Sequence, residues 1–149
     1  MEQRTELSDN TASASEWLAF AQTDFGVAEH LYNTYYPRPL EIICYHCQQC
    51  AEKSVKAIIA LHGNHGGLPK RHDLLLLLNQ IKNMVHIEEK YYDYADTLTP
   101  YGISVRYPNE LFLEERHAEQ ALAMAKEFLF FASEQITENT NNNRSTENE

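Results

Sequence analysis

The chain has 149 residues, of which 43% are hydrophobic, and this size and composition are typical of one compact domain. Its formal net charge is −10, so binding to a nucleic-acid backbone would need a local basic patch that outweighs the overall charge. The N-terminus lacks the basic start and apolar stretch of a signal peptide, and the apolar run 74–78 is far shorter than the about 20 residues that span a bilayer.

Both ends of the chain are polar. Segments 1–14 and 137–149 each carry three acidic residues and one basic residue. Segments with so few hydrophobic residues bury too little apolar surface to offset the entropy lost on folding. We therefore expect two disordered tails and a single domain at 15–136, which holds −6 of the net charge.

Between these tails the sequence predicts an all-α domain, because no segment alternates polar and apolar residues over a β-branched run. The first helix should begin near Ser13 or Ser15 and end before Pro37, and Asn109 is the expected N-cap of the last. Short connections place consecutive helices side by side, so we expect an up-and-down bundle of two long antiparallel hairpins with shorter helices. The expected helices cover about 14–35, 40–62, 72–84, 87–98 and 109–136.

The second of these helices contains the spacing Cys44-x2-Cys47-x2-Cys50, with His46 inside it. Such spacing occurs in iron–sulfur and zinc sites, but it also places the cysteines on one face of a helix, where they pack as small hydrophobic residues. Three thiols stacked along one helix make a poor tetrahedron. The sequence therefore favours packing, with no metal and no cofactor. An odd number of clustered cysteines also favours a reducing cytoplasm.

The segment 48–57, Gln-Gln-Cys-Ala-Glu-Lys-Ser-Val-Lys-Ala, resembles the second-helix signature of the HEPN family, Gln-Gln-Ala-x-Glu-Lys-x-x-Lys-Ala. Three further pieces occur in the family's order: the stripe 17–31, Lys70-Arg71-His72-Asp73-Leu74, and Arg106-Tyr107-Pro108. The resemblance covers about 15–136. It implies a HEPN-like fold, similar to a nucleotidyltransferase substrate-binding subunit, and a homodimer whose groove holds the site.

The resemblance also implies two roles. One is as partner of a minimal nucleotidyltransferase in a two-protein toxin–antitoxin-type system, and the other is binding of a nucleotide or phosphate in the dimer groove. Family ribonucleases use an Arg followed by a His after four to six residues. Here ten residues separate Arg106 from His117, and seven separate Arg38 from His46. We therefore expect a non-catalytic binding or regulatory module, with a metal-independent ribonuclease that pairs Arg106 with His72 or His117 as the alternative.

The expected anion site centres on Arg106, with Tyr107 beside it. Lys70, Arg71 and His72 would contribute from the start of the third helix, where free backbone N–H groups favour anions. Asp73 could instead cap that helix and occupy those donors. A structural alternative pairs Arg106 with a buried carboxylate such as Asp24.

The polar residues of the signature helix have two interpretations. Lys53 or Lys56 could be a second phosphate contact, or Gln49 and the two lysines could form a solvated face with a Glu52–Lys56 ion pair. A group of tyrosines, which we expect at a dimer surface because acidic residues flank them, lies later in the chain. Its members are Tyr91, Tyr92, Tyr94, Tyr101 and Tyr107.

Overall fold

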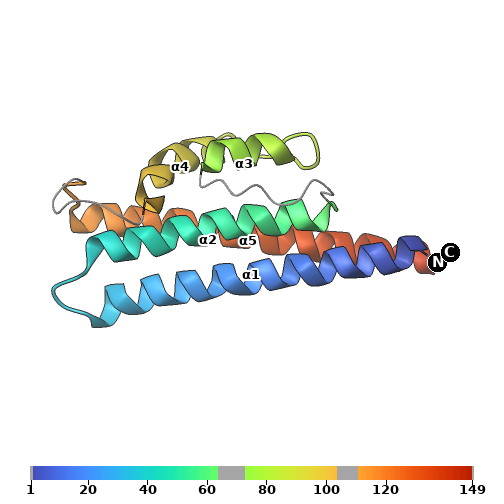
Figure 1. Ribbon diagram of the computed structural model, residues 1–149, viewed down its shortest axis with the longest axis horizontal. Coiled ribbons are helices and arrows are strands. Elements are labelled where there is room, and N and C mark those ends of the chain that lie inside the picture. Colours follow the sequence, from blue (N-terminus) through green and yellow to red (C-terminus); the bar gives the residue numbers. More distant parts are fainter. Residues whose placement is uncertain (1, 64–72, 104–110, 149) are drawn as a thin grey trace.

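The structure, a computed structural model, describes residues 2–63, 73–103 and 111–148. These residues form five α-helices and one short 3₁₀ helix (Figure 1). Within the described ranges no strand is present, so the expected all-α class is confirmed. The elements are α1 (Glu2–Thr34), α2 (Leu40–Leu61), α3 (Leu74–Ile81), α4 (Lys90–Leu98), η1 (Thr99–Gly102) and α5 (Glu115–Glu147).

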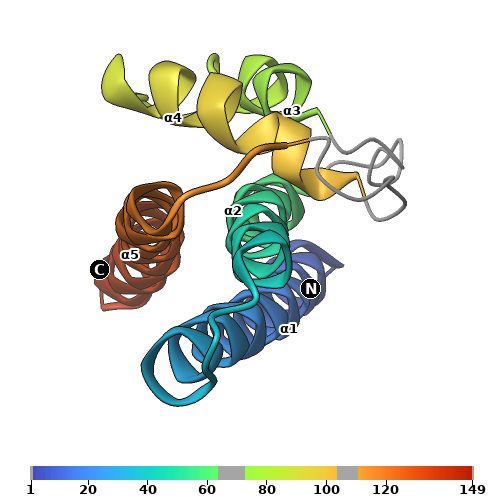
Figure 2. The ribbon, with the colours of Figure 1, turned by 90° about the vertical axis from the view of Figure 1, so that its left-hand side faces the viewer.

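The long helices α1, α2 and α5 form one bundle, and α3 and α4 form a second layer across α2 (Figures 1 and 2). The helices α1 and α2 make the expected antiparallel hairpin. By contrast, α5 runs in the same direction as α2: Arg38, just before α2, contacts Glu115 at the start of α5, and Cys50 contacts Ala125 further along. The second long antiparallel hairpin is therefore absent, because the chain returns through the α3–α4 layer before α5 begins.

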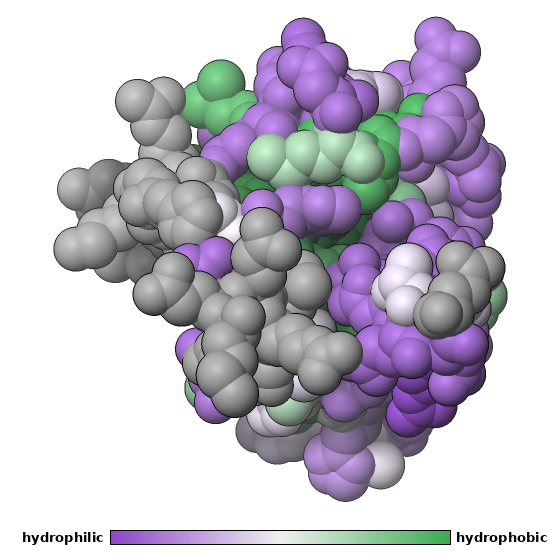
Figure 3. Space-filling model, turned by 90° about the vertical axis from the view of Figure 1, so that its right-hand side faces the viewer, coloured by the Kyte–Doolittle hydropathy of each residue, from purple (hydrophilic) through white to green (hydrophobic). Residues whose placement is uncertain are grey.

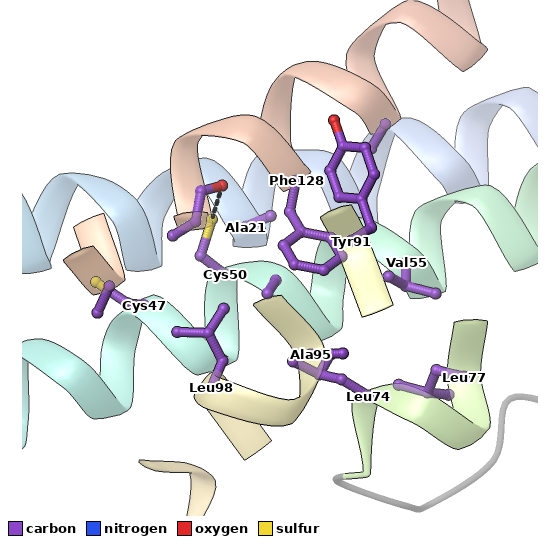
Figure 4. Close-up of a cluster of buried hydrophobic side chains, with 14 of the residues drawn as sticks. Ala21, Cys47, Cys50, Val55, Leu74, Leu77, Tyr91, Ala95, Leu98 and Phe128 are labelled. Carbon is purple, nitrogen blue, oxygen red and sulfur yellow. Dashed lines mark hydrogen bonds between the residues drawn. The ribbon is translucent and has the colours of Figure 1, made fainter. Parts of the chain in front are cut away.

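Helix α2 is the centre of the core. It contains no Gly or Pro, and 15 of its 22 residues are buried, because the other helices pack around it. Figure 4 shows Cys47, Cys50 and Val55 of α2 in one buried cluster with side chains from the surrounding helices. The ring of Phe128 from α5 is fully buried and meets the ring of Tyr91 edge-on, with 5.1 Å between centroids. A continuous apolar core therefore joins both layers.

Polar contacts define the helix ends. Asp73 is the N-cap of α3, and its side chain accepts from the backbone N–H groups of Leu75 and Leu76, as expected. Gly63 follows α2 with φ +65°, a conformation that favours glycine, so α2 ends there. The last helix begins at Glu115 and not near 109. Its N-cap is Glu114, which forms a capping box with His117.

The two segments expected to be tails differ from the structure, since 2–14 continues α1 and 137–147 continues α5. Ala14 is fully buried, and the Asn10 side chain lies against Gly63 at the end of α2. Neither segment contains Gly or Pro, and extending a packed helix avoids the unfavourable nucleation step. Among the described residues, no helix is both long and apolar enough to cross a membrane.

Candidate functional site

Four of the candidate site residues lie in the described part of the chain: Asp24, Gln49, Lys53 and Lys56. The others fall outside the described residues, and these are Lys70, Arg71, His72, Arg106 and Tyr107. The structure therefore gives the surroundings of the signature helix α2 and the described residues that flank the two basic segments.

Asp24 of α1 is the buried carboxylate that the sequence indicated, and its described partners are two side chains of α2. His46 Nδ1 lies 2.8 Å from Asp24 Oδ1, and Lys53 Nζ lies 2.5 Å from Asp24 Oδ2. The Asp24 side chain is 11% exposed, whereas those of His46 and Lys53 are each 26% exposed. Because His46 and Lys53 are two helical turns apart, they face α1 together and bracket one carboxylate. We call these three residues the Asp24 cluster.

The Asp24 cluster lowers the pKa of its own carboxyl group. Burial raises the pKa of the Asp24 carboxyl, but the hydrogen bonds and positive charge of His46 and Lys53 outweigh burial, so the pKa lies below its ordinary value. An ionised carboxylate only accepts hydrogen bonds, so His46 Nδ1 must carry a hydrogen. In a neutral ring this leaves Nε2 as the acceptor. The Lys53 ammonium has a carboxylate partner and is not a free anion-binding group.

Lys56 is buried, so the expectation of a solvated polar face on α2 is wrong. Gln49 and Lys56 are each 8% exposed, and Glu52 is 2% exposed. The expected helical ion pair is confirmed, with 3.5 Å between Lys56 Nζ and Glu52 Oε2. Lys56 Nζ also lies 5.5 Å above the centre of the Trp17 ring. Burial follows because α1 covers this face of the central helix.

The start of α3 meets η1, and η1 meets α2. The backbone N–H of Leu74 donates to Thr99 Oγ1 at 3.4 Å. Three residues later, a Cβ on Gly102 would lie 2.6 Å from Gln48 Cδ, so a larger residue would displace the end of the Gln48 side chain. Gln48 is fully buried and accepts a hydrogen bond from Gln49 Nε2 at 2.8 Å. Leu74 follows the first basic segment and Gly102 precedes the second. The described residues beside both segments therefore come together near the signature helix.

All three cysteines are buried and unpaired, which confirms the packing interpretation. The Cys50 thiol donates to the Ala125 carbonyl at 3.7 Å (Figure 4). Burial raises the pKa of Cys44 and that of Cys50 to about 12. Over the described residues, no three His, Cys, Asp or Glu side chains form a set that could hold a metal ion.

Two of the tyrosines expected at a dimer surface belong to the core instead. Tyr91 is 6% exposed and stacks on Phe131, with ring centroids 5.0 Å apart, and Tyr101 is 8% exposed. The acidic neighbours of these tyrosines in the sequence did not predict their burial, because Tyr91 takes part in an apolar contact between α4 and α5.

His117, one of the two histidines proposed for the ribonuclease alternative, has a structural partner. Its Nδ1 accepts a hydrogen bond from the Glu114 backbone N–H at 2.9 Å, which closes the capping box of α5. The ring is therefore oriented by the helix end. The other candidate, His72, lies outside the described residues.

A second polar cluster, which the sequence did not predict, lies where α1 turns into α2. The Arg38 guanidinium is 4.0 Å from the centre of the Tyr32 ring and 4.8 Å from that of Tyr36. It donates to Glu115 Oε1 at 2.9 Å and to the Tyr32 carbonyl oxygen at 2.7 Å. The Tyr32 hydroxyl donates to Glu119 Oε1 at 2.6 Å. These contacts attach the α1–α2 turn to the start of α5.

Comparisons with known proteins agree with this architecture. The HEPN domain family matches residues 14–136. Among solved structures, TT1696 from Thermus thermophilus is 26% identical, with a TM-score of 0.72 over 82% of this chain and 97% of that one. ST0689, an archaeal HEPN homologue, is 22% identical, with a TM-score of 0.65 over 83% of this chain and 97% of its own.

No curated protein matches the chain. The family match covers the hairpin α1–α2, the α3–α4 layer and most of α5. It spans well over half of the chain, and TT1696 shares the arrangement of the helices. The chain therefore belongs to the HEPN domain family.

Proposed function

We propose that this chain is a non-catalytic binding module that holds a phosphate-bearing ligand, such as a nucleotide, beside α2 where α3 begins and η1 ends. The observation that supports the proposal most directly is the contact between Leu74 and Thr99, together with the contact between Gly102 and Gln48. The first contact joins the described residues beside the two basic segments to each other, and the second holds η1 against the signature helix.

The covalent chain limits how far the basic residues can lie from these flanks. Lys70, Arg71 and His72 immediately precede Asp73, and Arg106 follows Gly102 by four residues. Four residues of fully extended chain span at most about 14 Å. Two basic segments tethered this closely can supply the guanidinium and ammonium groups that bind a phosphate.

The charges of α2 support binding by these segments and not by α2 itself. Lys53 pairs with Asp24, and Lys56 pairs with Glu52 in a buried contact. Either lysine would have to give up its contact with a buried carboxylate to reach a phosphate, which is costly. We therefore assign the ligand contact to Arg106, Tyr107, Lys70, Arg71 and His72, and a positioning role to Asp24 and Gln49.

The absence of an Arg-x4–6-His motif in the sequence supports a binding role over catalysis. A ribonuclease would need an imidazole next to the scissile bond to exchange protons, and the ring of His117 is held at the start of α5, where its Nδ1 accepts from the Glu114 backbone N–H and leaves only Nε2 for proton transfer. We propose further that the chain is a cytoplasmic homodimer and that a minimal nucleotidyltransferase is a candidate partner. The homodimer and the nucleotidyltransferase partner are proposed from the family to which the chain belongs.

Calorimetric titration with ATP, and separately with inorganic phosphate, tests the ligand proposal. We expect binding of ATP to the wild-type protein and at least about tenfold weaker binding to Arg106→Ala, because a charge-assisted contact contributes about 1.5–3 kcal/mol. Arg144→Ala, which removes the same charge from an exposed position near the end of α5, is the matched control. Equal affinities for the three proteins would refute the assignment.

The ribonuclease alternative is tested with single-stranded RNA in EDTA. Degradation by the wild-type protein that Arg106→Ala abolishes would replace the binding proposal with an enzymatic one. Light scattering at micromolar concentration tests the homodimer, since a single species of 17.2 kDa would refute it. Affinity purification with mass spectrometry then asks whether a nucleotidyltransferase is recovered in near-equal amount.

A further inference from the structure

An open cavity of about 440 Å³ lies at the end of the bundle where α1 turns into α2. Figure 2 looks onto this end, where the beginnings of α2 and α5 lie side by side. The volume falls in the range of about 300–1,000 Å³ that is usual for binding sites. The cavity is lined by Arg38, Leu40, Glu41, Phe112 and Leu113.

Large apolar and aromatic side chains are exposed at this end of the chain. Phe112 is 81% exposed, and three side chains close in sequence to the lining residues 38–41 are each more than half exposed, namely Tyr35, Tyr36 and Ile42. The opposite end of the bundle, which carries both termini, is mostly hydrophilic, with hydrophobic atoms in a recess on the side of the α3–α4 layer (Figure 3). Exposed aromatic groups beside a cavity are typical of binding surfaces.

Among the described residues that line the cavity, the charge without an ion-pair partner is negative. Glu115 neutralises Arg38, whose guanidinium is also held between two tyrosine rings. Glu41 is exposed at the start of α2 and has no cation within ion-pair distance among the described residues. The cavity thus has a mostly polar lining, to which Leu40 and Leu113 add apolar surface, together with an exposed aromatic ring and one uncompensated carboxylate.

We propose that this cavity is a docking site for a basic, apolar segment of a partner protein. A lysine or arginine side chain of the partner lies along Leu40 and Leu113, and its charge reaches Glu41. Long basic side chains bury their stems on apolar surface while their charged ends find a carboxylate, and the Phe112 ring attracts the same cation. This inference does not depend on the proposed phosphate ligand, because it concerns different residues and a ligand of opposite charge.

Glu41 also has a structural explanation, since a carboxylate in the first turn of a helix stabilises the helix N-terminus. That role affects the stability of the protein, whereas docking affects the affinity for a basic partner. Two variants separate the roles: Glu41→Gln keeps the size of the side chain, and Phe112→Ala changes an exposed side chain that caps no helix.

The test uses two fluorescein-labelled helical peptides, one built from leucine and lysine and the other from leucine and glutamate. Fluorescence anisotropy measures their affinity for the full chain, and amide chemical shifts locate the contact. We expect the leucine–lysine peptide to bind, with shift changes at Arg38, Glu41 and Phe112. Glu41→Gln and Phe112→Ala should each raise its Kd at least about tenfold, as expected for loss of a charged or aromatic anchor.

Glu138→Gln and Phe130→Ala are matched controls, because both residues are exposed on α5 away from the cavity. We expect both controls to bind like the wild-type protein. Equal weakening by Glu41→Gln and Glu138→Gln would mean that the peptide only senses overall acidity, and it would overturn the proposal. So would tighter binding of the leucine–glutamate peptide, no binding of either peptide, or shift changes confined to another surface.

Discussion

Replacing Asp24 by asparagine isolates the energetic contribution of the Asp24 cluster. The carboxylate accepts from His46 and Lys53, and hydrogen bonds to charged groups contribute about 1.5–3 kcal/mol each. Asparagine keeps one acceptor oxygen but brings an N–H₂ group toward one of its two donors. Because Lys53 is 26% exposed, water recovers part of the loss. We therefore expect Asp24→Asn to lower the free energy of unfolding by about 2 kcal/mol.

The assay is urea or thermal unfolding followed by circular dichroism. With an unfolding entropy of about 2.1 cal/mol/K per residue, 149 residues give about 0.3 kcal/mol/K, so 2 kcal/mol corresponds to a fall in Tm of about 6 °C. The control is Asp96→Asn, which removes an exposed carboxylate from α4 and should change Tm little.

The effect of Asp24→Asn should also depend on pH. The folded-state pKa of Asp24 lies below its unfolded value, so its stabilisation is fully present above the unfolded pKa of about 3.9 and is lost as the pH falls through the folded pKa. The difference between wild type and Asp24→Asn should therefore stay constant from neutral pH to about pH 5 and shrink below about pH 4. A difference below about 0.5 kcal/mol at neutral pH, or one that persists undiminished in acid, would refute this account.

Three further substitutions and one chemical treatment test the packing. Gly102→Ala should destabilise the fold by about 1–3 kcal/mol because its Cβ would meet the buried Gln48 side chain. Gly26→Ala, in open space within α1, should instead stabilise the fold by about 0.5–1 kcal/mol. Equal effects of the two substitutions in urea unfolding would contradict the contact. Phe128→Ala should lower the free energy of unfolding by about 3–5 kcal/mol, since the ring is fully buried, and a loss below about 1 kcal/mol would contradict its place in the core. The three thiols should react with Ellman's reagent at mildly alkaline pH only after denaturation, because burial raises their pKa values; rapid reaction of the native protein would place at least one of them at the surface.

Much of the fold could be predicted because local signals coincide with packing. The expected range of the second helix, 40–62, differs from α2 by one residue, since Pro39 precedes the helix and Gly63 follows it. Composition misled at the two ends of the chain. A polar segment with no breaker can continue a helix that is already anchored, and composition alone does not report the anchor.

The site was harder to predict, because its contacts join residues that are distant in sequence. The sequence identified Asp24 and Lys53 separately, yet no spacing rule connects them or adds His46. The cluster around Arg38 gave no signal at all, since Tyr32, Arg38 and Glu115 meet only when α5 lies beside the α1–α2 turn. Sequence patterns report the face of a helix, whereas pairing across helices depends on tertiary geometry.

The parallel course of α2 and α5 has a consequence for the order of folding. The hairpin α1–α2 closes through a short turn, but Cys50 of α2 reaches Ala125 of α5 across 75 positions of the chain. Closing so long a loop costs chain entropy before any contact compensates it. We therefore expect the α1–α2 hairpin to form early and α5 to dock late. During synthesis, the central helix would stay exposed on one side until the last third of the chain had emerged.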